Sequence, residues 1–310
     1  MPLTIGFAAW SAPTAESKPQ ESQTSASKWQ TKSVAILDAP QTLPRVLPQK
    51  HTIKKKSLKH KIVVDGSTLT TDELKLDLTR FAKTVRSVEK DGHRVGVVIL
   101  DLGTNASVSY GADEVFYPAS SVKAPFVISV YEDLVDSGRI TRAEVSQLAE
   151  PTIVRSDNEA YRALHRLCGN KDFADWAVST GAIEKDSKDY QQFSTVYYPD
   201  MSARQLAIMW EHCFDYLAHG GESAEELLEL FERVEVSPIR AGLTNDELTI
   251  TKAGWYPSDD GERYEATADS GIVFENGHAY VFVVMTDIAD DLALLSELIP
   301  GIWSATSVLN

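Results

Sequence analysis

The chain has 310 residues, 43% of them apolar, so it can bury a hydrophobic core in one large domain or two small ones. No apolar run approaches the length of a membrane-spanning helix, and we expect no integral membrane domain. Residues 1–61 carry ten Lys and Arg against three acids within a net charge of −15, which leaves −22 for residues 62–310. This acidity argues against a nucleic-acid partner and favours a monomer kept apart by self-repulsion.

The first sixty residues differ in composition from the rest. Pro2 to Ala15 is small and apolar and is similar to the end of a secretory signal peptide, although a basic n-region is absent. We expect a secreted or cell-surface protein with a truncated signal; an unstructured tail is the alternative. Glu16 to Pro48 is rich in Ser, Gln, Thr and Pro, which indicates a disordered spacer. The basic run Lys54–Lys61 could contact anionic wall polymer or lipid headgroups, but we interpret it as a solvated linker. Residues 1–61 are therefore expected to be a signal-like remnant and a disordered basic linker, followed by one domain over residues 62–310.

The folded region is predicted to open with a helix and a β-hairpin. Thr70-Thr-Asp-Glu73 is a capping box, and the apolar residues that follow share one helical face: Leu74, Leu78, Phe81, Ala82, Val85 and Val88. Arg94 to Leu102 predicts a strand, and Gly103-Thr-Asn turns the chain into a second strand around Ser107 to Tyr110.

The middle of the chain is helical and its end returns to β-structure. Short helical segments extend to about residue 234, and one final amphipathic helix is predicted from about Asp290 to Leu298. The strands between them are Leu248–Gly254, Ala266–Phe274 and Ala279–Thr286, with Asn276-Gly277 as a hairpin turn. This order predicts an α+β fold, in which the two ends form one antiparallel sheet flanked by terminal helices. An all-helical lobe is inserted, with a cleft between the lobes.

The cysteines and histidines indicate neither a metal site nor a cofactor. Cys168 and Cys213 lie in predicted helices without metal-ligand spacing, so we expect two small buried side chains; a single bridge in an exported protein is the alternative. The seven histidines are scattered and contain no His-x-x-x-His pair.

Ser120 and Lys123 form a Ser-x-x-Lys motif within Pro-Ala-Ser-Ser-Val-Lys-Ala-Pro. On a helix this spacing places both side chains on one face, so the lysine can take the serine proton and create a nucleophile for acyl transfer. The spacing alone is not specific, because Ser25-Ala-Ser-Lys28 and Ser87-Val-Glu-Lys90 match it as well.

Two further motifs follow Ser120 in order. Ser156-Asp157-Asn158 stands at the head of a predicted helix, and Lys252-Ala253-Gly254 ends a predicted strand. With them the chain resembles the class A β-lactamase and penicillin-binding-protein superfamily, whose signature is Ser-x-x-Lys, Ser-Asp-Asn and then Lys-Thr-Gly on a strand. The first hairpin and the segment Ile239–Leu243 resemble the family too. The resemblance covers about residues 70–305 and implies a β-lactamase/transpeptidase-like fold.

The resemblance implies a serine hydrolase without a metal or cofactor. Ser120 would attack a carbonyl, Lys123 would shuttle its proton, and Ser156 would relay a proton to the leaving nitrogen. A neutral lysine needs a depressed pKa, to which the charge of Lys252 would contribute. The implied substrate-binding residues are Asn158, Lys252, Gly254 and Trp255, with the backbone N–H groups of Ser120 and Trp255 facing the oxyanion.

Three departures from the family concern substrate recognition. Ala253 replaces the Thr or Ser whose hydroxyl would bond the substrate carboxylate, a loss of about 1.5–3 kcal/mol. Ser270 stands where many class A enzymes have a carboxylate-binding arginine. Only 36 residues separate Ser120 from Ser156, fewer than in class A enzymes, so part of the helical lobe is expected to be trimmed.

A fourth departure concerns deacylation. Class A β-lactamases carry a glutamate after Ser-Asp-Asn that activates the hydrolytic water, but residues 188–200 contain no Glu. Gln191 or Gln192 falls near that place and cannot take a proton. Glu184 and Asp189 remain as candidate bases, and Asp200 is expected to anchor the end of the loop.

Three functions stay open at this stage. The first is a β-lactamase-like serine hydrolase acylated on Ser120 by a β-lactam or a related amide or ester. The second is a penicillin-binding-type D,D-peptidase or esterase acting on a peptidoglycan peptide. The third is a non-catalytic module that binds wall peptide, although such a module would not need a nucleophile with its proton relay.

Overall fold

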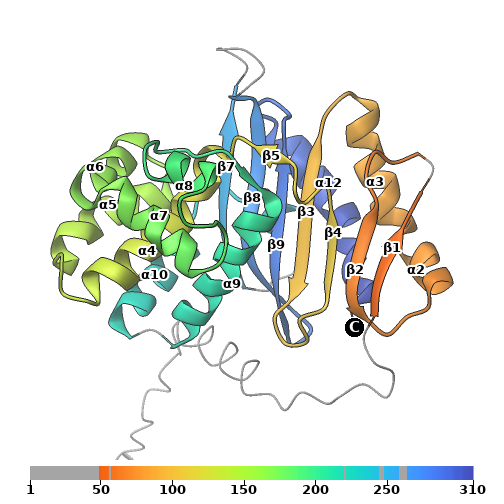
Figure 1. Ribbon diagram of the computed structural model, residues 1–310, viewed down its shortest axis with the longest axis horizontal. Helices are drawn as coiled ribbons and strands as arrows, with labels where there is room; N and C mark the ends of the chain where they lie inside the picture. The colour runs from red at the N-terminus through yellow and green to blue at the C-terminus, as the bar shows by residue number, and fades with distance from the viewer. Residues whose placement is uncertain (1–48, 56, 220, 244–247, 258–263, 310) are drawn as a thin grey trace, which may run out of the picture.

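The computed structural model describes residues 49–55, 57–219, 221–243, 248–257 and 264–309. Its centre is a seven-stranded antiparallel sheet of strand order β1-β2-β4-β3-β9-β8-β7 (Figure 1). The strands are β1 (Gln49–Ile53), β2 (Ile62–Ser67), β3 (Val95–Asp101), β4 (Ser107–Tyr110), β7 (Thr249–Tyr256), β8 (Ala266–Glu275) and β9 (His278–Thr286). Strands from both ends of the chain thus share one sheet, which confirms the predicted α+β fold.

The sheet begins further toward the N-terminus than the expected domain start at residue 62. Gln49–Ile53 form β1, which pairs with β2 from Ile53 opposite Ile62 to Gln49 opposite Ser67. Only Ile53 of this strand is buried, so the sequence lacks the alternating apolar pattern from which a strand could be predicted. In the basic run, Lys55 Nζ donates to the Lys75 carbonyl at 2.6 Å. The signal-like segment and the spacer lie outside the described residues.

Terminal helices cover one face of the sheet. They are α2 (Thr71–Asp77), α3 (Thr79–Lys90), α12 (Leu292–Trp303) and the 3-10 turn η4 (Ser304–Val308) (Figure 1). The predicted capping box at Thr70 is present, but the single helix expected there is divided at Leu78. Alternation along β9 explains the two-sided burial: Phe282 and Val284 join this core, whereas Val283 belongs to the core of the opposite face.

A helical lobe occupies the other side of the sheet (Figure 1). Its elements are η1 (Ala119–Val122), α4 (Lys123–Val130), the π-helical turn η2 (Tyr131–Val135), α5 (Arg142–Val154), α6 (Asn158–Cys168), α7 (Asn170–Ser179), α8 (Lys188–Phe193), α9 (Ala203–His219) and α10 (Glu222–Glu232). The short helix α11 (Pro238–Gly242) lies on the other face, where it packs against α12. A two-stranded ribbon of β5 (Val115–Phe116) and β6 (Met201–Ser202) lies next to the helical lobe. Cys168 and Cys213 are free and buried in this lobe, as the first interpretation predicted.

The hairpin between β8 and β9 turns at Asn276 and Gly277, as predicted. Their φ angles are +52° and +83°, the left-handed pair that a two-residue type I′ turn requires.

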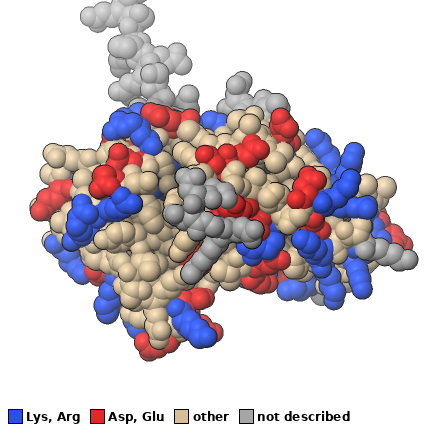
Figure 2. Space-filling model, turned by 90° about the horizontal axis from the view of Figure 1, so that it is seen from above, with Lys and Arg blue, Asp and Glu red and all other residues tan. Residues whose placement is uncertain are grey.

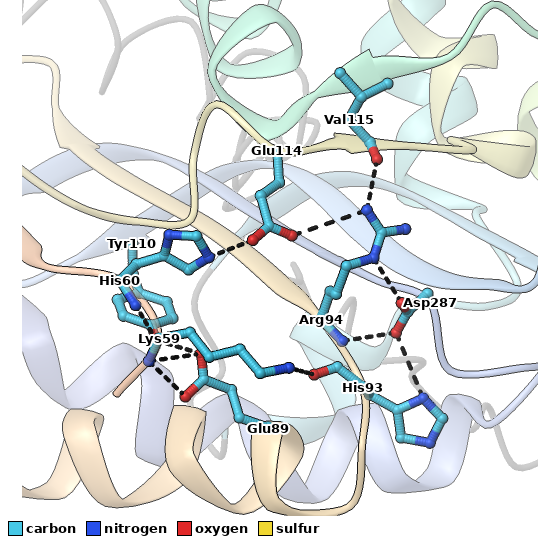
Figure 3. A network of polar contacts seen from close by, with 9 residues as sticks. All are labelled: Lys59, His60, Glu89, His93, Arg94, Tyr110, Glu114, Val115 and Asp287. Carbon is cyan, nitrogen blue, oxygen red and sulfur yellow. Dashed lines mark hydrogen bonds and ion pairs between the residues drawn. The ribbon is translucent and has the colours of Figure 1, made fainter. Parts of the chain in front are cut away.

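A network of polar contacts joins the β1–β2 connection to the chain segment that leads to Ser120 (Figure 3). His60 Nε2 pairs with Glu114, and Arg94 lies between Glu114 at 3.8 Å and Asp287 at 2.8 Å. Arg94 also donates to the Val115 carbonyl at 3.1 Å. These contacts hold the start of β5, a few residues ahead of the nucleophile turn.

Charged side chains of both signs are interspersed on the face seen in Figure 2. No helix in the described ranges is both long enough and apolar enough to cross a membrane.

Candidate active site

Ser120 lies in the short turn η1, directly before α4. Ala119 ahead of it has a φ of +46°, a left-handed conformation that is costly for a residue with a Cβ and that often occurs at functional sites. Ser121 closes the turn, because its hydroxyl donates to the Pro118 carbonyl at 2.7 Å. Ser120 itself is half-buried, and its side chain is therefore presented by a fixed turn.

Lys123, the first residue of α4, is fully buried. Its Nζ donates to the Ser156 carbonyl at 2.6 Å, to Asn158 Oδ1 at 2.7 Å and to the Asp157 carbonyl at 3.3 Å. Burial, aided by the nearby charge of Lys252, lowers the pKa of Lys123 to about 7. The Lys123 ammonium group thus has three hydrogen-bond acceptors, yet it can lose a proton near neutral pH. The Ser120 hydroxyl has no hydrogen bond to a described residue, and such catalytic contacts commonly tighten only when substrate binds.

Ser156 lies between the two lysines. Its carbonyl accepts from Lys123, and its Oγ accepts from Lys252 Nζ at 2.9 Å. Its φ is +61°, so this residue too is held in a left-handed conformation. Lys252 is buried on β7, and burial lowers its pKa to about 8 against the opposing effect of Asp269.

Asn158 begins α6. The helix cap is its neighbour Asp157, whose carboxylate accepts from the Ala160 N–H at 2.7 Å, so capping accounts for Asp157 and not for Ser156. Asn158 Oδ1 accepts from Lys123 and also from the Tyr198 hydroxyl at 2.9 Å. Among the described residues, 156–158 therefore supply the hydrogen-bond acceptors of the Lys123 ammonium group, which also lies 5.4 Å from the centroid of the Tyr161 ring.

Strand β7 lies at one edge of the sheet and approaches the nucleophile turn at Gly254. A Cβ at this position would lie 2.4 Å from Ser121 N, 2.5 Å from Pro118 O and 2.6 Å from Ser120 N. Only glycine allows so close an approach. This contact brings the following residue, Trp255, to the turn that carries Ser120.

Tyrosines form a cluster next to the nucleophile turn. The ring of Tyr117 lies 5.2 Å from Tyr264, 5.7 Å from Tyr256 and 6.1 Å from Tyr198, between ring centroids. Burial raises the pKa of Tyr117 to about 12, so its phenol stays protonated at neutral pH. The four tyrosines come from segments far apart in the chain, so no local sequence pattern predicts the cluster.

A comparison with protein families finds a match over most of the described chain. The model of the beta-lactamase enzyme family matches residues 78–145 and 136–302. The chain belongs to this family. A comparison with curated proteins finds no match.

Solved structures share the fold at low sequence identity. A beta-lactamase from Chitinophaga pinensis is 19% identical, with a TM-score of 0.60, over 74% of this chain and 99% of that one. PBP-A is 21% identical, with a TM-score of 0.59, over 74% of this chain and 96% of that one. A beta-lactamase from Sphaerobacter thermophilus is 21% identical, with a TM-score of 0.58, over 74% of this chain and 96% of that one.

Two residues that the sequence analysis named as departures from the family pattern are buried in strands β7 and β8. Ala253 is buried and offers no hydroxyl. Ser270 is buried too, and its Oγ accepts from Trp210 Nε1 at 2.9 Å, which turns it toward the core.

Sequence reasoning missed a buried carboxylate, Asp269, which lies opposite Ala253 in the β7–β8 register. The Ser237 hydroxyl and the Ile239 N–H each donate to it at 2.9 Å, and burial raises its pKa to about 6. Its charge favours the protonated form of Lys252. Its strand also contains Thr267, Ser270 and Glu275, so the sequence pattern did not single out Asp269.

The candidate deacylation bases make no hydrogen bond with the residues around Ser120. Glu184 is exposed, and exposed Asp189 accepts from Gln205 Nε2 at 2.6 Å. Gln192 donates to Asp200 at 3.2 Å, a contact consistent with the expected anchoring of the loop. The loop residue that does reach the site is Tyr198. Among the described residues no group of His, Cys, Asp and Glu could hold a metal ion.

Proposed function

We propose that this protein is a serine hydrolase in which Ser120 is acylated by a β-lactam or by a related amide or ester. One observation carries the proposal: Lys123 is buried, lies one turn from Ser120, and has its pKa lowered to about 7. Burial of Lys123 and Lys252, which lowers both pKa values, destabilises the folded state. A protein that only binds a ligand has no need of this arrangement. The two lysines support catalysis over a purely binding module.

The acylation step uses groups that the site brings together. Neutral Lys123 accepts the Ser120 proton while Oγ attacks the carbonyl carbon, and the resulting oxyanion faces the N–H groups of Ser120 and Trp255. Collapse of the tetrahedral intermediate breaks the bond to nitrogen. Ser156, bonded to Lys252, passes a proton to the leaving nitrogen, and the proton held by Lys123 replaces it.

Release of the acyl group is proposed to be slow. No described carboxylate makes a hydrogen bond with Lys123 or Asn158, so a water beside the acyl-enzyme lacks a side chain suited to take its proton. The acyl group then persists or passes to another acceptor. This favours a penicillin-binding-type peptidase or esterase acting on wall peptide as the second candidate. PBP-A, one of the proteins with this fold, has a variant solved as an acyl-enzyme complex with penicillin G.

The setting proposed for this reaction is the cell surface or the exterior. The signal-like N-terminal segment supports export, and the acidic surface supports a monomer. A peptidoglycan peptide or a β-lactam is the proposed partner.

Incubation with benzylpenicillin, followed by intact mass, and nitrocefin colour over time test the proposal. The expected result is a lasting adduct that Ser120→Ala abolishes. The control is Ser87→Ala, which alters one of the other Ser-x-x-Lys matches; Ser87 bonds only within α3, to the Thr84 carbonyl at 2.7 Å. Rapid colour would instead indicate efficient β-lactam turnover. No adduct and no cleavage of any ester or amide probe would contradict the proposal and leave the binding module.

A further inference from the structure

Tyr198 connects the loop between α8 and β6 to the catalytic residues. Its hydroxyl donates to Asn158 Oδ1 at 2.9 Å, and the same oxygen accepts from Lys123 Nζ at 2.7 Å. The ring is half-buried and is held by its neighbours, with centroids 5.1 Å from Tyr161 and 6.1 Å from Tyr117. The contact of Tyr198 with the site is therefore the hydrogen bond from its hydroxyl to Asn158, and the neighbouring rings hold its own ring in place.

The two donors determine which way the Asn158 amide faces. An amide oxygen accepts two hydrogen bonds, and here Lys123 and Tyr198 occupy both places. No described residue accepts a hydrogen bond from Nδ2 of Asn158, and this residue is exposed at the start of α6. The NH₂ group is thus left to donate to a bound molecule.

Lys123 alone cannot maintain this orientation during a reaction. As the base it must lose a proton, and a neutral amine has a lone pair that could accept from Nδ2 of a rotated Asn158 amide. Tyr198 keeps its proton at neutral pH, since burial raises its pKa above the ordinary value. Rotation of the amide would leave this phenol proton without its acceptor, at a cost typical of one unmade hydrogen bond.

We propose that Tyr198 is a positioning residue: its hydroxyl holds the Asn158 amide with the NH₂ group facing the acyl donor. Binding of an acylamino side chain by Asn158 is a role that the family resemblance already implies, and the new element is that this role depends on Tyr198. The carbonyl oxygen of such a side chain is the acceptor that the NH₂ group requires. This inference rests on the proposed function, because it assumes that the site accepts an acyl donor.

The test compares two β-lactams that share the reactive ring: benzylpenicillin, which has the acylamino carbonyl, and 6-aminopenicillanic acid, which lacks it. Tyr198→Phe keeps the ring and removes only the donor. We expect acylation by benzylpenicillin to slow about tenfold, the value of one hydrogen bond, and acylation by 6-aminopenicillanic acid to change less than about twofold.

Tyr197→Phe is the matched control. Tyr197 is the neighbouring tyrosine, its carbonyl accepts from the Tyr161 hydroxyl at 2.6 Å, and its own hydroxyl has no hydrogen bond to a described residue. It should leave both rates unchanged. If Tyr198 only braced the loop, Tyr198→Phe would lower the melting temperature and slow both substrates equally, and this would overturn the inference.

A second readout separates failure of this inference from failure of the proposed function. If the wild-type protein is acylated by neither compound, the proposed function is wrong. The side-chain amide signals of Asn158 in a ¹⁵N NMR spectrum then decide the inference without any substrate. They should move in Tyr198→Phe and stay in place in Tyr197→Phe; unchanged signals in both variants would refute the role of Tyr198.

Discussion

The acylation side of the site and the loop side are built in opposite ways. On the acylation side, Lys123 and Lys252 are buried and hydrogen-bonded to groups at the head of α6. On the loop side, Glu184 and Asp189 are exposed, and the contact with the site comes from a tyrosine. Burial lowers the pKa values of the two lysines, whereas the two exposed carboxylates have no hydrogen bond to either lysine. Under the proposed function, this difference predicts that the formation and the release of an acyl-enzyme depend on separate parts of the molecule.

The largest effect should come from Lys123, the centre of the acylation side. Lys123→Met removes the base and is expected to slow acylation by benzylpenicillin about 10²–10⁴-fold, as measured by mass spectrometry. The control Lys90→Met changes the exposed lysine of another Ser-x-x-Lys match and should have no effect. An unchanged acylation rate in Lys123→Met would show that Lys123 is not the base, and the proposed difference between the acylation side and the loop side would be wrong.

Gly254 should come next. In Gly254→Ala the new Cβ would clash with Ser121 N and Ser120 N, so the nucleophile turn or the strand must shift. A displacement of about 1 Å at a reacting group can cost about 100-fold in rate, and we expect a loss of that order. Gly221→Ala is the control, because a Cβ there meets no described atom within 4 Å. Equal acylation rates in the two variants would show that close approach of β7 is not required.

The pH dependence of acylation should follow Lys123. The base is active when neutral, so the rate should rise as pH increases through about 7, the value to which burial lowers the Lys123 pKa. In Lys252→Gln the like charge is lost, which raises the Lys123 pKa and should move this limb to higher pH. Rates measured between pH 5 and pH 9 test both statements. A flat profile, or a limb that moves to lower pH, would contradict the assignment of the base.

Much of this arrangement could be predicted from sequence because it depends on local patterns. Apolar periodicity located the strands β3, β8 and β9, and the three ordered motifs located Ser120, Lys123, Ser156 and Lys252. The geometry brings the last three together through hydrogen bonds. Their catalytic roles stay predictions.

The parts that could not be predicted depend on contacts between distant segments. Strand β1 is mostly polar and is held by pairing with β2, a non-local interaction without a periodic signal. Tyr198 and Asn158 are 40 positions apart, and a tyrosine ahead of a proline has no distinguishing feature in the sequence. Asp269 is identified only by its buried partners Ser237 and Ile239.

The smallest effects should come from the exposed acids of the loop side. Glu184→Gln and Asp189→Asn are expected to change the lifetime of the acyl-enzyme less than about twofold, because neither carboxylate has a hydrogen bond to Lys123 or Asn158. The measurement is the decay of the penicillin adduct by intact mass, with Glu159→Gln, an exposed acid of α6, as the control. An adduct that lasts more than about ten times longer in one loop variant, and not in the control, would identify that residue as the missing base. Release would then depend on a loop that moves its carboxylate toward Ser120 after acylation, and the acylation side and the loop side would both take part in one reaction cycle.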